Sequence, residues 1–150
     1  HTLSVVKMCD FYAANYPIIN RDLLISSALL HDLGKMDEIS PYPKNDYTDD
    51  GQLLGHIFIG ASKVSERIKS IPEFPEKLAS ELLHCMLGEL EYGSPKKPAT
   101  IEALALHYAD NTDSKLQIMT ELLNSNDPKV DWMGYQRLFE SNVMRSSKGV

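Results

Sequence analysis

A histidine and an aspartate stand side by side at His31-Asp32, where the apolar run 23–30 ends. Imidazole nitrogens and carboxylate oxygens both bind divalent metal ions. A His/Asp mixture without thiolates suits Mn²⁺, Fe, Zn²⁺, Ni²⁺ or Mg²⁺ rather than a structural zinc site. Neighbouring side chains on a helix point about 100° apart, so the pair can share one ion only in the crevice between their directions. Ligands from another part of the chain must then complete the site.

Other histidines and one aspartate are candidates for those ligands: His1, His56, His107, and Asp110 one helical turn after His107. An unpaired carboxylate buried inside a long helix is costly, and a metal ion would remove that cost at Asp110. His107 either orients Asp110 or belongs to the core. His56 is either a ligand or a hydrogen-bonded polar residue at a helix edge.

Simpler interpretations exist for several of these residues. Taken alone, His31-Asp32 could be a polar pair at a helix C-terminus, where the helix dipole favours histidine. Lys35 could likewise be only a C-terminal helix charge. His84, which lies in the apolar sequence LLHCML, is predicted to be a packed, hydrogen-bonded histidine.

Helices separated by loops would position these residues. We expect helices over 2–16, 21–33, 52–70, 76–87 and 100–123, with loops over 36–50 and 88–98. Asn20 and Thr100 are predicted N-caps, and Gly34 is predicted to occupy the C′ position after the second helix. The third helix should bury a face that carries Leu53, Leu54, Ile57, Ala61, Val64 and Ile68. No strand alternation is visible, and the tail 131–145 is mixed, so the predicted fold is an all-α bundle of about five to seven helices.

Length and charge limit the function. The 150 residues suit one domain over 1–150, and because the chain opens on His1 we expect the catalytic part or another fragment of a longer protein. The net charge of −6 argues against holding nucleic acid by phosphate neutralisation alone. No apolar stretch approaches the roughly 20 residues of a membrane span. Cys9 and Cys85 suggest neither a disulfide framework nor a CxxC site, so both are predicted core residues of a cytoplasmic protein.

Four motifs occur in an order that resembles the HD-domain metal-dependent phosphohydrolases: HTLSV, LLHDLGK, GHIFIGA and HYADNTDSKL. Within that superfamily, YTDDGQLLGHI, GELEYGSPKKP and LHYADN most resemble the HD domain of YhaM-type 3′→5′ exoribonucleases. This resemblance implies that the metal ligands are His1, His31, Asp32 and Asp110, with His56 for a second ion. It also implies that Lys35 faces the substrate phosphate, so that Asp32, Lys35 and Asp110 are the catalytic residues.

One departure from the family pattern lies at Leu87-Gly88. Relatives with a two-metal site usually carry adjacent histidines here, and this sequence has none. Either the protein has lost the pair, which would favour a single ion, or residues are missing from the sequence at this point. Tyr92, in the following loop, could stack on a base.

The predicted function is metal-dependent phosphoester hydrolysis, and most concretely 3′→5′ exoribonuclease activity with manganese. RNA binding would then depend on an N-terminal OB-type domain, which the resemblance implies for the longer protein. A nucleotidase or cyclic-nucleotide phosphodiesterase that acts on small molecules is one alternative. The other is a degenerate HD module that senses a metal or nucleotide.

Overall fold

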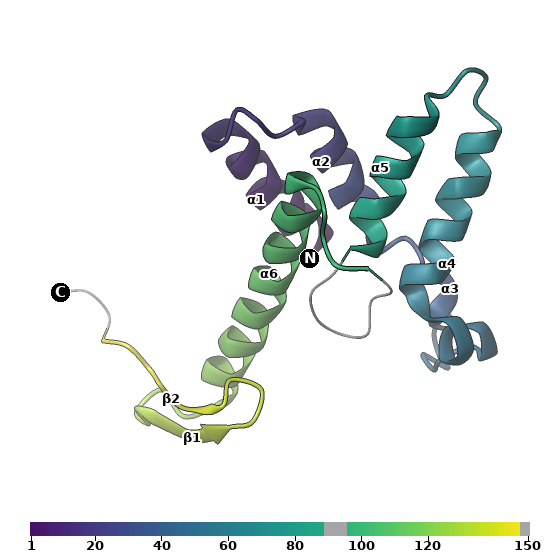
Figure 1. Cartoon of the computed structure of the whole chain (residues 1–150). Coiled ribbons are helices and arrows are strands. Elements are labelled where there is room, and N and C mark those ends of the chain that lie inside the picture. Colours follow the sequence, from purple (N-terminus) through teal and green to yellow (C-terminus); the bar gives the residue numbers. More distant parts are fainter. Residues whose placement is uncertain (89–95, 148–150) are drawn as a thin grey trace. The chain divides into compact units, whose positions relative to one another are not determined.

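Helices make up most of the computed structural model, which describes residues 1–88 and 96–147 (Figure 1). The described elements are α1 (Thr2–Asn15), α2 (Arg21–Leu30), α3 (Lys35–Glu38), α4 (Asp49–Lys69), α5 (Glu76–Leu87), α6 (Ile101–Ser125), β1 (Trp132–Gln136) and β2 (Ser141–Met144). The chain divides into two compact units, His1–Asn111 and Thr112–Val150. The helix content confirms the predicted all-α class, whereas Tyr92 lies outside the described residues.

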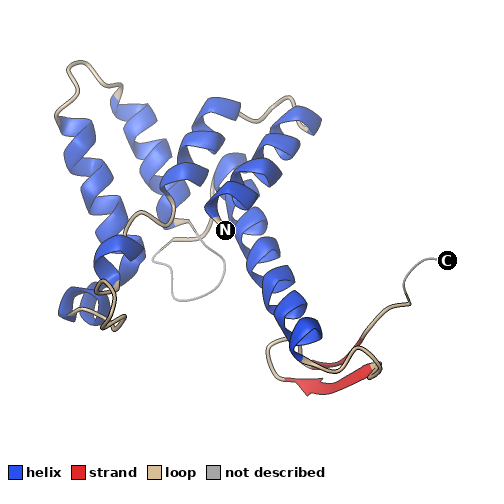
Figure 2. Ribbon diagram, turned by 180° about the vertical axis from the view of Figure 1, so that it is seen from behind, coloured by secondary structure: helices blue, strands red, loops and turns tan. Residues whose placement is uncertain are grey.

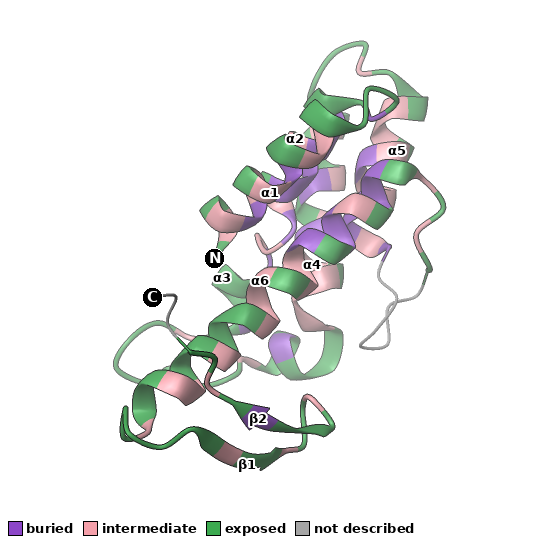
Figure 3. Cartoon of the chain, turned by 90° about the vertical axis from the view of Figure 1, so that its left-hand side faces the viewer, coloured by how far each residue is buried: buried purple, intermediate pink, exposed green. Residues whose placement is uncertain are grey.

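The core of the first unit lies where α1 packs on α2 and α2 packs on α5. Its buried residues gather on these helices and on the first turns of α6 (Figure 3). Cys9 and Cys85 are free and buried there, which confirms that both are core residues. Burial, assisted by the charge of Asp110, raises the pKa of the Cys9 thiol to about 12, and burial also raises the pKa of Cys85.

Helix starts in the first unit follow the predicted caps. The Asn20 side chain accepts a hydrogen bond from the Leu23 N–H (3.2 Å), and Thr100 Oγ1 accepts one from the Ala103 N–H (3.2 Å). Thr48 also caps α4, by accepting a hydrogen bond from the Gly51 N–H at 2.9 Å. This cap starts α4 at Asp49, three residues before the predicted start.

The end of α2 differs from the prediction. The helix ends at Leu30 rather than at residue 33, and residues 31–34 form a turn that leads into α3. Gly34 has φ −66°, so the predicted left-handed C′ role is wrong. A Cβ on Gly34 would lie 1.9 Å from the His56 carbonyl oxygen, so glycine is required here by a close approach of two backbones.

A second difference lies in α4, which is broken at Gly55 (φ 72°, ψ 158°). The break changes the direction in which the preceding residues point. Leu53 and Leu54 are therefore 80% and 50% exposed, and their predicted burial is wrong. After the break, Ala61 and Val64 are buried, which confirms the predicted apolar face in this part of α4. The short helix α3 also covers the first three residues of the segment 36–50, which was predicted to be a loop.

In the second unit, β1 and β2 form an antiparallel hairpin (Figure 2). This is a correction, since no strand was expected in the tail. The apolar-polar alternation that would predict these strands from the sequence is weak. The pairing register is irregular between Trp132 and Gly134, and Gly134 has φ 74°. Val143 is the one residue of the two strands that is buried. Among the described helices, none combines the length and apolar character needed to cross a bilayer.

Candidate metal centre

His31 is the most deeply buried side chain among the candidate ligands. It follows the last residue of α2 and is buried. Its Nδ1 lies 2.8 Å from the carbonyl oxygen of Ala28, and because a carbonyl can only accept, Nδ1 carries the proton. The lone pair on Nε2 is thereby directed away from α2, which is the state a metal-binding histidine needs.

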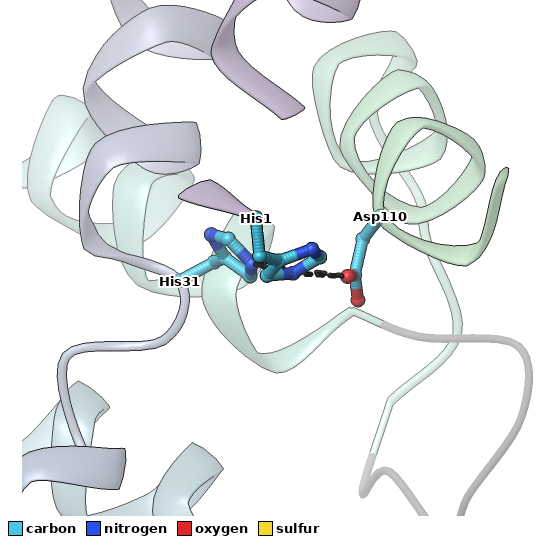
Figure 4. A group of neighbouring side chains, drawn as sticks. All are labelled: His1, His31 and Asp110. Carbon is cyan, nitrogen blue, oxygen red and sulfur yellow. Dashed lines mark hydrogen bonds and ion pairs between the residues drawn. The ribbon is translucent and has the colours of Figure 1, made fainter. Parts of the chain in front are cut away.

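Three residues from distant parts of the sequence meet at this nitrogen (Figure 4). His1 lies between His31 and Asp110: its Nε2 is 3.4 Å from His31 Nε2 and 3.0 Å from Asp110 Oδ1. His31 Nε2 and Asp110 Oδ1 are 3.8 Å apart. The helix that carries Asp110 is α6, so three elements supply one donor atom each.

Asp32 adds a fourth donor from the same turn as His31. Its Oδ2 lies 3.5 Å from His1 Nε2 and 3.5 Å from His31 Nε2. An ion with ligands at about 2.1 Å holds neighbouring donor atoms about 3.0–3.4 Å apart. The distances among the donor atoms of His1, His31 and Asp110 are close to that range, so these three residues fit a divalent cation, and Asp32 lies beside them. We call His1, His31, Asp32 and Asp110 the four-donor cluster.

Two further predicted residues, Lys35 and His56, also lie close to Asp32. Lys35 Nζ is 2.8 Å from Asp32 Oδ2, and its side chain is half-exposed. His56 Nε2 is 3.9 Å from Asp32 Oδ1. Asp32 therefore faces different partners with its two oxygens: Oδ2 lies near His1, His31 and Lys35, and Oδ1 lies near His56.

The charge balance around Asp110 favours a bound cation. Burial raises the pKa of the Asp110 carboxyl above its ordinary value, and the charge of Asp32 raises it further. Positive charge acts in the opposite direction, from His31 and His107 when their rings are protonated and from Lys35. A divalent cation at the cluster would favour the ionised carboxylate much more strongly, because it brings two positive charges.

The remaining histidines have other surroundings. His84 Nε2 accepts a hydrogen bond from the Ala99 N–H at 2.8 Å, which confirms the predicted hydrogen-bonded role. His107 is buried, with its ring edge-on to Tyr108 at 5.1 Å between centroids.

At the departure from the family pattern, α5 ends at Leu87, and Gly88 then forms an isolated parallel bridge with Lys96.

Sequence reasoning missed one residue at the site, Glu38. Its Oε1 lies 3.0 Å from both the backbone nitrogen and Nδ1 of His56. No sequence signal marks it, because Asp37, Asp46, Asp49 and Asp50 surround it in a segment that was predicted to be a loop. Its role depends on a contact between α3 and α4.

Comparison with known proteins extends this description. The HD domain family model matches residues 1–115. The 3′-5′ exoribonuclease YhaM of Bacillus subtilis (strain 168) is 38% identical over 131 residues, which cover 85% of this chain and 41% of that protein. YhaM of Geobacillus sp. (strain WCH70) and YhaM of Listeria innocua are each 37% identical over 131 residues, covering 85% of this chain and 40% and 42% of those proteins.

The chain thus spans about two fifths of the length of these relatives. No solved structure shows significant similarity to it. The matched region contains all of the four-donor cluster, together with Lys35 and His56. The family match over most of the chain, with the His-Asp turn beside His1 and Asp110, shows that this chain belongs to the HD-domain family.

Proposed function

We propose that this chain is a metal-dependent phosphohydrolase, and that the four-donor cluster binds its divalent ion. The observation that carries this proposal is the convergence of donor atoms from His1, His31 and Asp110, 3.0–3.8 Å apart. Asp32 Oδ2 lies 3.5 Å from both imidazole nitrogens. When bound, a divalent ion polarises a phosphoryl oxygen and lowers the pKa of a bound water. Manganese is the favoured ion, because a mixed His/carboxylate set suits it.

In this proposal Asp32, Lys35 and Asp110 are catalytic, and His1, His31, Asp32, His56 and Asp110 are metal ligands. The Lys35 ammonium is held beside Asp32 but remains half-exposed, so it can turn toward a substrate phosphate and offset its charge. The hydrogen bond from His31 Nδ1 to the Ala28 carbonyl leaves the lone pair of the neutral ring on Nε2, the nitrogen that faces the cluster. Asp110 contributes a carboxylate from the rigid helix α6.

The proposed reaction is 3′→5′ hydrolysis of single-stranded RNA. The support comes from the relatives, which are named 3′-5′ exoribonucleases. The net charge of −6 means that this chain has little electrostatic attraction for RNA. We therefore propose that residues 1–150 form a single HD domain, the catalytic part of a cytoplasmic protein whose N-terminal OB-type domain grips the RNA.

The test is hydrolysis of a 3′-extended, 5′-labelled oligoribonucleotide by the chain supplied with Mn²⁺, run beside a panel of mononucleotides and cyclic nucleotides. Stepwise shortening from the 3′ end is expected, and Asp110→Ala should abolish it. Asp22→Ala is the matched control, because the Asp22 side chain is 97% exposed and lies outside the cluster.

Other outcomes would change the proposal in defined ways. Phosphate release from the small nucleotides, with the oligoribonucleotide left intact, would replace the exoribonuclease with a nucleotidase or cyclic-nucleotide phosphodiesterase. The net charge of −6 is the observation that favours this second candidate. Metal uptake with no hydrolysis of any substrate would instead indicate a sensing module.

A further inference from the structure

Glu38 is a carboxylate that is nearly enclosed, with a side chain only 10% exposed. Removing a carboxylate from water is costly unless hydrogen bonds or charges compensate for the loss. Its compensation comes from His56, whose backbone N–H and ring Nδ1 both lie 3.0 Å from the same oxygen, Oε1. One side chain therefore contacts both the backbone and the ring of a single histidine.

This contact determines which ring nitrogen of His56 carries a proton. An ionised carboxylate only accepts hydrogen bonds, so Nδ1 must be the donor to Glu38. In the neutral ring, Nε2 then keeps its lone pair, and Nε2 is the atom that lies 3.9 Å from Asp32 Oδ1. His31 has the same arrangement: its Nδ1–H donates a hydrogen bond to the Ala28 carbonyl, and its Nε2 faces the cluster.

Backbone geometry holds both partners in place. The break at Gly55 leaves the His56 N–H without a helical acceptor, and Glu38 accepts its hydrogen bond. On the other side, the Glu38 carbonyl oxygen accepts the Thr48 N–H at 2.9 Å, and Gly51 packs directly against it. The pair is thus fixed from α3 and from both parts of α4.

We propose that Glu38 is a positioning residue that holds His56 as its Nδ1–H tautomer and directs Nε2 toward Asp32, where the family resemblance implies a ligand for a second divalent cation. The inference rests on the proposed function, in which His56 is a metal ligand. Glu38 itself does not touch the ion. Partners of this kind orient a ligating histidine and raise its basicity.

The first experiment measures the tautomer in the metal-free full chain by long-range ¹H–¹⁵N correlation NMR of the histidine rings, with His56 assigned from His56→Gln. Nδ1–H is expected in the wild type. Glu38→Ala should shift His56 toward Nε2–H or toward a mixture of tautomers. Glu38→Gln should preserve Nδ1–H, because the amide oxygen can still accept the hydrogen bond.

Glu102→Ala is the matched control. Glu102 is also buried, and its Oε1 accepts the Asn20 N–H at 2.7 Å, but it contacts no histidine among the interactions described. Both alanine variants should lower the free energy of unfolding by a similar amount. Only Glu38→Ala should change the His56 tautomer, which separates positioning from general stabilisation.

The second experiment is calorimetric titration with Mn²⁺. Glu38→Ala should weaken the lower-affinity binding event about 10–100-fold, while Glu38→Gln and Glu102→Ala stay near the wild type. An unchanged tautomer in Glu38→Ala, or equal losses of affinity in Glu38→Ala and Glu102→Ala, would overturn the inference. Hydrolysis is measured separately. A chain that cleaves no RNA but shows the Glu38-dependent tautomer and metal binding would refute the exoribonuclease and leave the positioning role intact.

Discussion

Gly34 shows how a single residue in the His-Asp turn serves the candidate site. It has ordinary right-handed backbone angles, so the conformational freedom of glycine is not the reason why glycine is needed here. The nearest atom to a Cβ at this position would be the His56 carbonyl oxygen, with the Gly60 nitrogen next, at 2.7 Å. The absence of a side chain therefore allows the turn that carries His31 and Asp32 to lie directly against α4.

Gly34→Ala is predicted to be strongly destabilising, because the added methyl meets backbone atoms that cannot rotate away. We expect a loss of about 1–3 kcal/mol or more in the free energy of unfolding, measured by chemical denaturation. Ser26→Ala, at an exposed position on α2, is the control and should stay within about 0.5 kcal/mol of the wild type. Equal stability of the two variants would contradict the close approach.

At the scale of elements, the site depends on where helices stop. α2 ends before His31, so the His-Asp pair lies in a turn and can face both α1 and α6. α4 is interrupted at Gly55, which frees the His56 N–H for Glu38. Each interruption places a histidine of the candidate site at the first position after the break.

Gly55→Ala tests the break in α4, and Gly134→Ala is its matched control. The two glycines have nearly equal φ values of 72° and 74°, and neither has an atom near the position of a Cβ. Each substitution should therefore cost about 1–3 kcal/mol from backbone strain alone. Only Gly55→Ala should also weaken Mn²⁺ binding, measured by calorimetry, because it moves His56. Equal effects of both variants on Mn²⁺ binding would refute the functional role of the break.

At the scale of the whole molecule, ionising the buried Asp110 carboxyl in the metal-free protein costs stability. Because burial raises the pKa of Asp110, the native state binds more protons than the unfolded chain between the ordinary pKa and the raised one. The free energy of unfolding therefore falls as pH rises through that window, and the full cost applies above it. A cation that binds only the folded chain would reverse this loss.

Asp110→Asn should separate the two effects in a thermal unfolding experiment at pH 7. Without metal, its Tm should equal or exceed that of the wild type, because the buried charge is gone. With Mn²⁺ at 100 times its Kd, the wild type should gain about 2.7 kcal/mol and the variant much less. Asp22→Asn, at an exposed carboxylate, should behave as the wild type does. A variant that is less stable without metal but gains as much from Mn²⁺ would contradict the assignment.

The sequence by itself determined the chemistry of the donors and most of the helices. Helical periodicity and the caps at Asn20 and Thr100 are local properties, so the starts of α2 and α6 and the whole of α5 could be predicted. The order of His1, His31-Asp32 and Asp110 carried the family resemblance, which the HD domain match confirms.

Only the tertiary structure decided how those donors meet. The end of α2 follows from the contact of Gly34 with His56, and the role of Glu38 follows from the packing of α3 on α4. The hairpin of β1 and β2 likewise depends on pairing between strands whose alternation is broken at Gly134. These features rest on contacts between residues that are distant in the sequence, which local propensities do not encode.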